Sequence, residues 1–351
     1  MAPIRNACVR YVGPPEGYVE PDVHVKYDGT RTIELDDAEL NGGFILKTLC
    51  LSIDPYMRGR MCKPETVLYF GAFEPGRPLS GYGVGQVVRS EDPAFRPGEV
   101  VHGWMSHEEY SVYSCRSITI MPFRKIADVG VPWSVYTGIL GVPGQTAFYA
   151  WKAYSQSRPG ECAFISTAAG AVGSLVVQLA KRDGLRVIAS SGTEDKRAFA
   201  LQCGADVSFN YKNEKVADVL AREAKGIDIY FDNVGGEHLE TALAYSNHAG
   251  RFIECGMASL YNGQRPHHVE NLQLIIIREI TLQGVFCHSP RFRAQYEDEF
   301  YSVITQMVKD GTLKYREHIS YGLETVGHAL RDVGMGTNVG KRVVVLDSST
   351  P

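Results

Sequence analysis

The chain has 351 residues, of which 44% are hydrophobic and 22% charged, and its formal net charge at pH 7 is -4. This composition is typical of a globular protein, and the length predicts about two domains, each with its own core. The small negative charge gives no electrostatic basis for binding nucleic acid or an anionic membrane. The N-terminus lacks the apolar segment of a secretory signal, no stretch has the length of a membrane span, and the eight cysteines include no C-x-x-C pair. We therefore expect a cytoplasmic protein with reduced cysteines.

The first part of the chain, up to about residue 136, has a β-rich pattern. Short apolar alternations at residues 43–49 and 83–88 are separated by Gly and Pro, and a Pro-Gly turn at 97 and 98 leads into a further apolar segment. These features predict short strands joined by turns. The pattern returns at the end of the chain, where a strand is expected at 340–346.

Between these parts, apolar strand patterns alternate with helical periods, which is typical of βαβ units and a parallel sheet. The clearest later strands are expected at 185–190, 227–232 and 250–255. We therefore predict an α/β protein in which a nucleotide-binding domain, residues 137–307, is inserted into a β-rich domain formed by residues 1–136 and 308–351. The cleft between two such domains is the usual location for a ligand.

One turn in the inserted region has the pattern of a dinucleotide site. The apolar run Cys162–Ile165 is followed by Ala168-Ala169-Gly170-Ala171-Val172-Gly173 and then by an apolar stripe at helical spacing. Gly170 would let the backbone approach a pyrophosphate, and Gly173 would let the helix pack closely on the sheet. The helix N-terminus would offer N–H groups and a positive dipole to the phosphates. Because Ala168 replaces the first glycine of the usual fingerprint, an ordinary buried strand–helix turn is the alternative.

The next strand indicates which dinucleotide is bound. An acidic residue about 20 residues after the turn would hold the ribose 2′-hydroxyl of NAD, and no acid stands there. The strand instead ends in small uncharged residues, with Lys196 and Arg197 just beyond. Such a turn and the nearby cations suit the negative charge of a 2′-phosphate. The alternative is that Lys196 is a solvated helix residue. We therefore predict NADP(H) as the cofactor.

Six segments occur in an order typical of a known family. They are Leu51–Arg58, Gly141–Phe148, Ala168–Gly173, Phe209–Lys212, Phe231–Gly236 and Val339–Lys341. Together they resemble the zinc-independent medium-chain dehydrogenase/reductases, in particular the prostaglandin and alkenal reductases, which include leukotriene 12-hydroxydehydrogenase and plant double-bond reductases. The resemblance runs from about residue 40 to the C-terminus. It implies a Rossmann doubly wound parallel sheet inserted in a GroES-like β domain, a homodimer, and NADPH-dependent reduction of a C=C bond conjugated to a carbonyl.

The sequence gives no support for a metal site. Zinc alcohol dehydrogenases of the same superfamily carry a Gly-His-Glu element and a catalytic cysteine, and the corresponding places here look like residues 79–83 and 52–56. His107 and the pair His267-His268 are the available candidates, but neither has companion residues at ligand spacing. We therefore predict that no metal is bound.

The resemblance also implies which residues contact the cofactor. The turn residues expected at the pyrophosphate are Gly170, Ala171, Val172 and Gly173. The residues expected at the 2′-phosphate are Lys196 and Tyr211. Asn233 is expected to hydrogen-bond the nicotinamide-side ribose or amide. The remaining residues expected along the nicotinamide end are Cys255, Gly256, Tyr261, Val285, Phe286, Cys287 and Asn338.

Hydride transfer to the β-carbon of an enone leaves negative charge on the carbonyl oxygen, so the site needs a hydrogen-bond donor there and must exclude water. Tyr56 and Tyr261 are the candidate catalytic donors because a phenol stays protonated near neutral pH. Tyr82 is expected to line the same substrate pocket. The alternative is that Tyr56 is an aromatic residue packed beside Pro55 with no catalytic role. Solvent is sufficient to protonate the α-carbon.

The predicted function is therefore NADPH-dependent reduction of the C=C bond of α,β-unsaturated ketones or aldehydes, with a small unsaturated carbonyl compound as substrate. Quinone reduction or the oxidation of a secondary alcohol would use the same fold and cofactor and is the second candidate. A non-catalytic NADPH-binding protein is the third.

Overall fold

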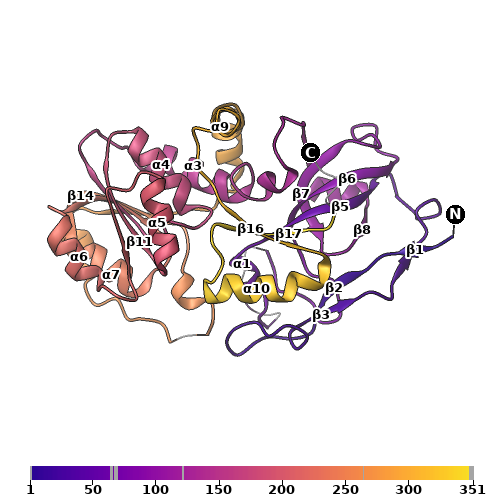
Figure 1. Cartoon of the computed structure of the whole chain (residues 1–351), viewed down its shortest axis with the longest axis horizontal. Coiled ribbons are helices and arrows are strands. Elements are labelled where there is room, and N and C mark those ends of the chain that lie inside the picture. The colour runs from indigo at the N-terminus through magenta and orange to yellow at the C-terminus, as the bar shows by residue number, and fades with distance from the viewer. Residues whose placement is uncertain (1, 64–65, 67–69, 121, 264, 348–351) are drawn as a thin grey trace. The chain divides into compact units, whose positions relative to one another are not determined.

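The computed structural model describes residues 2–63, 66, 70–120, 122–263 and 265–347. The chain forms two compact units, Met1–Gly141 with Glu317–Pro351, and Val142–Arg316. In Figure 1 the first unit contains the indigo to purple strands and the yellow C-terminal segment. These boundaries lie a few residues beyond those expected from the sequence. The segment before residue 142 packs on the sheet of the first unit, and the segment before residue 317 forms hydrogen bonds with the second unit.

The first unit is built on a seven-stranded sheet in the order β16-β17-β5-β6-β7-β9, with β8 also paired to β5. All of its pairings are antiparallel except that of β16 with β17. Its strands are β5 (Phe44–Ile53), β6 (Ser80–Ser90), β7 (Val100–Ser106), β8 (Tyr110–Tyr113), β9 (Arg124–Ile126), β16 (Glu317–Tyr321) and β17 (Lys341–Val345). The strands expected from the apolar alternations at 43–49, 83–88 and 340–346 are therefore confirmed.

Two short strand pairs and several short helices complete this unit. The pairs are β1 (Ile4–Arg5) with β4 (Thr32–Ile33), and β2 (Cys8–Tyr11) with β3 (Val25–Asp28). The helices are α1 (Tyr56–Arg60), α2 (Cys115–Ile120), η1 (Trp133–Thr137), η3 (Leu323–Thr325) and α10 (Val326–Met335). Apolar side chains from the sheet and from α10 form one core.

The second unit contains a six-stranded parallel sheet in the order β12-β11-β10-β13-β14-β15. Numbered within the unit, this order is 3-2-1-4-5-6, the arrangement of a Rossmann fold, which confirms the predicted fold class. The strands are β10 (Cys162–Ile165), β11 (Arg186–Ser191), β12 (Val207–Asn210), β13 (Ile227–Asp232), β14 (Ser246–Glu254) and β15 (Thr281–Gly284).

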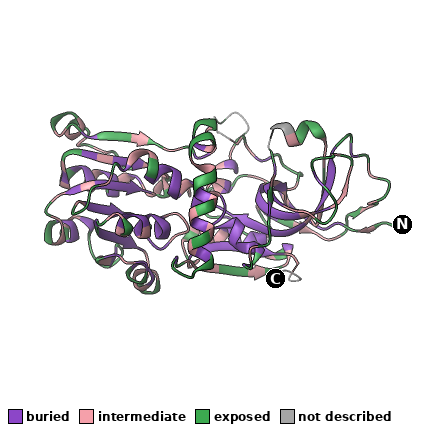
Figure 2. Ribbon diagram, turned by 90° about the horizontal axis from the view of Figure 1, so that it is seen from above, coloured by how far each residue is buried: buried purple, intermediate pink, exposed green. Residues whose placement is uncertain are grey.

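Helices cover both faces of this sheet. They are α3 (Val142–Tyr154), α4 (Gly173–Arg182), α5 (Glu194–Gln202), α6 (Val216–Glu223), α7 (Gly236–Tyr245), η2 (Ala258–Leu260), α8 (Gln273–Ile277) and α9 (Pro290–Lys309). α3 packs against α4 and α9, whereas α6 packs against α7 and α7 against α8. Figure 2 shows the buried residues concentrated in the strands and on the inner faces of the helices. Among the described residues, no helix is long and apolar enough to cross a bilayer.

Candidate functional site

The turn between β10 and α4 can be formed only with glycine at residue 173. A Cβ at Gly173 would lie 2.4 Å from the Thr167 carbonyl oxygen and 2.9 Å from the Ala168 Cα. At Gly170 a Cβ would lie 3.2 Å from the same carbonyl oxygen, which is a tight contact. No side chain caps the N-terminus of α4 in the part of the chain that the structure describes. The turn therefore presents backbone N–H groups and the positive end of a helix, which suit a pyrophosphate.

The turns after β11 and β12 bring Tyr211 close to Gly192. The Tyr211 hydroxyl oxygen lies 3.0 Å from the position that a Cβ at Gly192 would occupy. The Tyr211 ring packs edge-on against His238, with 5.4 Å between the ring centroids, and 41% of the residue is exposed. The absence of a side chain at Gly192 thus leaves room for the phenol beside the end of β11.

Two lysine ammonium groups influence each other next to this tyrosine. Burial lowers the pKa of Lys196, and the positive charge of Lys212 lowers it further, whereas Asp195 raises it. Lys196 lies in the first turn of α5, where its backbone N–H donates to the Thr193 hydroxyl at 3.3 Å. Because two like charges repel, a dianion near both ammonium groups would be bound favourably. The sequence prediction did not include Lys212, although it follows Tyr211 directly in one of the six segments.

The carboxyl ends of β10 and β13 are joined by Asn233. Its side-chain amide donates to the Ser166 carbonyl oxygen at 2.8 Å, and its backbone N–H donates to the Ser166 hydroxyl at 2.8 Å. Asp232, directly before it, accepts hydrogen bonds from the backbone N–H groups of Val234 and Gly235 at 2.7 and 2.8 Å. The turn after β13 is therefore held in shape by side chains of the sheet. The role of Asn233 toward a nicotinamide stays a prediction.

Tyr261 lies just after β14 and η2 with its hydroxyl turned back toward the strand end. The hydroxyl oxygen accepts a hydrogen bond from the Met257 backbone N–H at 3.2 Å and lies 3.3 Å from the position of a Cβ at Gly256. Burial raises the pKa of this phenol, so it is neutral at physiological pH. The N–H groups of Cys255 and Gly256 both donate to the Asp232 carbonyl oxygen, at 2.9 and 3.1 Å.

The segment after β15 completes the row of strand ends. The Val285 backbone N–H donates to the Glu254 carbonyl oxygen at 3.0 Å, Phe286 is 41% exposed and Cys287 is buried. The predicted site residues from Gly170 to Cys287 therefore lie at the carboxyl edge of one parallel sheet, where α/β proteins bind their ligands. The two expected at the 2′-phosphate follow β11 and β12, with Lys196 in the first turn of α5, and the others follow β10, β13, β14 and β15.

Tyr56 belongs to the first unit and begins α1 directly after a buried ion pair. The Lys341 ammonium group donates to the Asp54 carboxylate at 3.0 Å and to the Ile53 carbonyl oxygen at 2.6 Å. Two of the six segments, far apart in the chain, thus meet next to Tyr56. Arg58 donates to the carbonyl oxygens of Pro15 and Gly17, which is a structural role.

The Tyr56 hydroxyl is buried and has no hydrogen-bond acceptor among the residues that the structure describes. Burial raises the pKa of the phenol well above its usual value. The ring lies among other aromatic rings, with centroids 5.2 Å from Phe70 and 6.1 Å from Trp104. Tyr82 packs edge-on against Trp104 at 5.3 Å, so the structure brings Tyr56 and Tyr82 into one aromatic cluster. A neutral phenol with no internal acceptor is a hydrogen-bond donor available to a ligand.

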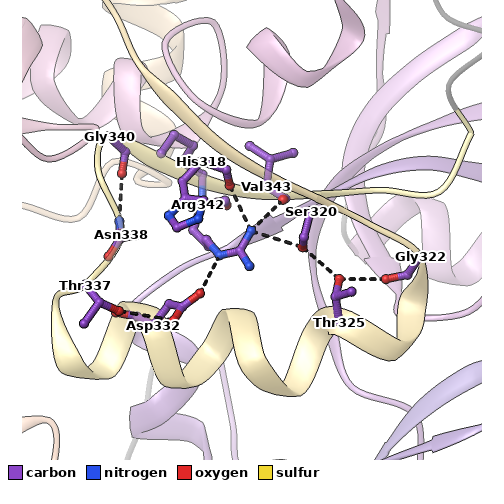
Figure 3. Close-up of polar contacts among 11 residues, drawn as sticks. His318, Ser320, Gly322, Thr325, Asp332, Thr337, Asn338, Gly340, Arg342 and Val343 are labelled. Atoms are coloured by element: carbon purple, nitrogen blue, oxygen red, sulfur yellow. Dashed lines mark hydrogen bonds and ion pairs between the residues drawn. The ribbon is translucent and has the colours of Figure 1, made fainter.

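Asn338 lies in the turn before β17 (Figure 3), where its side-chain amide donates to the Gly340 carbonyl oxygen at 2.8 Å. The neighbouring Arg342 guanidinium binds the Asp332 carboxylate and the His318 carbonyl oxygen, which joins α10 to β16 and β17. The structure therefore assigns the Asn338 amide to the turn itself. Its expected contact with a cofactor stays a prediction.

Comparison with known proteins shows the family. Residues 171–307 match the model of the zinc-binding dehydrogenases, and residues 15–121 match that of the N-terminal domain of oxidoreductases. The chain is 39% identical over 330 residues to a 2-alkenal reductase (NADP(+)-dependent) of Nicotiana tabacum, with 93% of each chain covered. It is 32% identical over 326 residues to prostaglandin reductase 1 of Bos taurus, covering 90% of this chain and 92% of that protein. The chain belongs to the prostaglandin and alkenal reductase group of the medium-chain dehydrogenase/reductases.

A solved structure agrees with this assignment. CurA of Vibrio vulnificus, crystallised in complex with NADPH, matches with a TM-score of 0.87 and 28% identity over 97% of this chain and 99% of that chain. The family assignment also confirms the GroES-like and Rossmann folds expected for the two units.

One matched domain is shared with zinc-binding dehydrogenases, so the surroundings of the candidate metal ligands bear on the chemistry. In residues 2–63, 66, 70–120, 122–263 and 265–347, no group of three or more His, Cys, Asp or Glu side chains is placed to hold a metal ion. His107 is fully buried, and burial together with the charge of Arg60 lowers its pKa to about 3. His267 forms an ion pair with Glu240. Independence from zinc stays a prediction for experiment.

Proposed function

We propose that this protein is an NADP(H)-dependent reductase of the C=C bond of α,β-unsaturated ketones and aldehydes. The observation that carries the proposal is the full-length similarity to a 2-alkenal reductase and a prostaglandin reductase. The carboxyl edge of the parallel sheet adds chemical support, because it offers a phosphate turn, paired cations and the neutral phenol of Tyr261.

The residues at this edge fit the dinucleotide. Gly170 and Gly173 leave the space in which a pyrophosphate reaches the N-terminus of α4. Lys196, Lys212 and Tyr211 supply two positive charges and a hydroxyl for a 2′-phosphate, and the last residues of β11 are serines rather than an acidic residue. Lys196 and Lys212 therefore favour NADP(H) over NAD(H).

The chemistry of this chain's own residues suits conjugate reduction. The bound dinucleotide supplies the hydride. Tyr56 and Tyr261 remain protonated because burial raises the pKa of both phenols, so each is able to donate to an oxygen that gains negative charge. Conjugate addition spreads this charge over an enolate, which one or two phenols are sufficient to stabilise. Solvent then supplies the α-carbon proton.

The test is a product analysis with C4-deuterated NADPH and a panel of enals, enones, quinones and matched saturated aldehydes. We expect oxidation of NADPH with the enals and enones, deuterium on the β-carbon of the product, and an intact carbonyl. The saturated aldehydes are the control and should not react. Deuterium on a carbinol carbon with the alkene retained would make the protein a carbonyl reductase, and turnover with quinones alone would favour the second candidate.

We also propose that two copies of the chain associate through the β15 edge of the parallel sheet. β15 ends the strand order, and a strand edge offers unpaired backbone groups to a second strand. Ile276 and Ile277 of the neighbouring α8 are 81% and 66% exposed, an apolar surface that a second copy would cover. Light scattering should give the mass of a dimer, and Ile276→Glu should shift it toward a monomer. A monomeric mass for the unmodified protein would refute this association.

A further inference from the structure

Asp232 and Glu254 form a carboxyl pair at the edge where the dinucleotide is proposed to bind. They are register partners on the parallel strands β13 and β14, so both side chains project from the same face of the sheet. The preceding pair on that face, Tyr230 and Phe252, stacks edge-on with 5.3 Å between ring centroids. The two carboxyl groups therefore continue a row that begins in the apolar core. Asp232 is fully buried.

When both carboxyl groups of this pair are ionised, three of their four oxygen atoms have no hydrogen-bond donor among the described residues. The Asp232 Oδ1 atom accepts from the Val234 N–H, the Gly235 N–H and the Tyr230 hydroxyl, at 2.7, 2.8 and 2.8 Å, and from the Ser166 hydroxyl at 3.3 Å. Its Oδ2 atom and both carboxyl oxygens of Glu254 are buried and have no donor among the described residues. The two side chains lie within hydrogen-bonding reach of each other. Two carboxylates cannot hydrogen-bond to each other without a proton, and adjacent carboxylates repel strongly in a buried site.

We propose that Glu254 is a positioning residue of the dinucleotide site: it shares one proton with Asp232, and this proton holds the turn at residues 233–236 in its binding shape. The inference rests on the proposed function in one respect, that this turn contacts the dinucleotide. With the proton present, Glu254 and Asp232 attract each other, and the Asp232 carboxylate keeps its bonds to Val234 and Gly235. Without the proton, a second negative charge lies beside Asp232, and the bonds that shape the turn are weakened.

The surroundings of the pair do not supply a compensating charge. Burial raises the pKa of Asp232, and burial together with the charge of Asp232 raises the pKa of Glu254 to about 8. The titratable groups that face the pair are neutral at that pH: they are Tyr230, Cys255 and Tyr261, each with a raised pKa, and His238 of α7, whose burial lowers its pKa to about 4. The shared proton therefore belongs to the two carboxyl groups together.

The sign of the pH dependence follows from the raised pKa. The folded protein holds a proton that the unfolded chain releases near the usual carboxyl pKa, so the stabilisation by this proton is complete below that value. It is lost as the pH rises through about 8. If the proton is required for the binding shape of the turn, the Kd for NADPH should rise about tenfold per pH unit above that point.

The experiment compares the unmodified protein with Glu254→Gln, whose amide donates to Asp232 at every pH. The matched control is Glu237→Gln, which makes the same substitution at an exposed residue of α7. The Kd for NADH, which lacks the 2′-phosphate and therefore does not depend on the charge of Lys196, is measured beside that for NADPH by protein fluorescence from about pH 6 to about pH 10. We expect the alkaline weakening of NADH binding in the unmodified protein and in Glu237→Gln, and a flat NADH profile in Glu254→Gln. An alkaline weakening of NADH binding that persists in Glu254→Gln would overturn the proposal.

Infrared spectroscopy of the protein without dinucleotide gives a readout that needs neither binding nor turnover. A protonated carboxyl band should be present at neutral pH, disappear as the pH rises through about 8, and be absent from Glu254→Gln. If that variant fails to fold, the titration of the band in the unmodified protein still decides the matter. Absence of the band would show that the pair shares no proton. Appearance of the band only after chelator treatment would show that a metal ion, rather than a proton, joins the pair. Failure to reduce enones, with these results intact, would refute the proposed function alone.

Discussion

Replacing Lys341 by methionine should destabilise the first unit more than any exposed lysine substitution. The Lys341 side chain is 4% exposed and that of Asp54 is 9% exposed, and the two form an ion pair at 3.0 Å between β17 and the end of β5. Methionine keeps most of the length and apolar volume of lysine but removes the charge. The Asp54 carboxylate would then be a buried charge with no cation beside it.

The loss of unfolding free energy depends on the hydrogen bonds that each partner keeps when the other is replaced. Without Lys341, Asp54 retains the hydroxyl of Ser52, which donates at 2.5 Å, and breaking one side of a buried pair in this way costs about 3–5 kcal/mol of unfolding free energy. Without the Asp54 charge, Lys341 retains the carbonyl oxygens of Ile53 and Arg342 at 2.6 and 3.0 Å. Asp54→Asn should therefore cost less than Lys341→Met. The double variant should recover much of the loss, since replacing both charges of a buried pair is often close to neutral.

Urea unfolding of the four proteins of this cycle, followed by tryptophan fluorescence, measures these differences. Lys47→Met is the matched control, because Lys47 also pairs with an aspartate but its side chain is 37% exposed, so the change should stay within about 1 kcal/mol. A Lys341→Met protein as stable as the control would refute the argument that this pair is structurally required. Equal and additive losses from the two single substitutions would show that the two groups do not interact.

Three further predictions concern the candidate site. Lys196→Ala and Lys212→Ala should each weaken the binding of NADPH by about tenfold or more and leave the binding of NADH nearly unchanged, because a charge-assisted hydrogen bond contributes about 1.5–3 kcal/mol. Equal losses of affinity for both dinucleotides would contradict the 2′-phosphate assignment. Tyr56→Phe and Tyr261→Phe should divide between them a loss in kcat on the order of 10²–10³, and Tyr56→Phe should change stability little because its hydroxyl has no described acceptor. Activity should survive prolonged dialysis against a strong chelator, and stoichiometric zinc that tracks activity would refute this.

The fold could be predicted from sequence wherever local pattern and local structure coincide. The apolar run Cys162–Ile165 and the turn ending at Gly173 lie next to each other in the chain, and the structure places them as the strand and helix start that the spacing indicates. Strand β11 begins one residue later than expected and β14 four residues earlier, at Ser246 rather than at residue 250. Boundaries shift in this way because pairing with neighbouring strands, rather than side-chain pattern, decides where a strand begins.

The contacts that sequence reasoning missed all depend on register or on distant segments. Lys341 and Asp54 are brought together only by the antiparallel pairing of β17 with β5. Glu254 faces Asp232 only because β14 aligns with β13 in one register. In the sequence Asp54, Asp232 and Glu254 each follow a mainly apolar run and Lys341 stands beside Arg342. Only the sheet shows which other charge lies opposite each of them. A charged residue at the end of an otherwise apolar strand was nevertheless a signal, since such a residue is rarely buried without a partner.

The pH dependence of the reaction separates the phenols from the carboxyl pair. Burial raises the pKa of Tyr56 and of Tyr261, so neither phenol ionises near neutral pH, whereas Glu254 has a pKa of about 8. An alkaline decrease in kcat/KM centred near that value should therefore persist in Tyr56→Phe and Tyr261→Phe at a lower overall rate. It should be absent from Glu254→Gln, which cannot lose a proton there. A decrease that disappears in Tyr261→Phe and persists in Glu254→Gln would assign the ionisation to the phenol and refute the role given to the carboxyl pair.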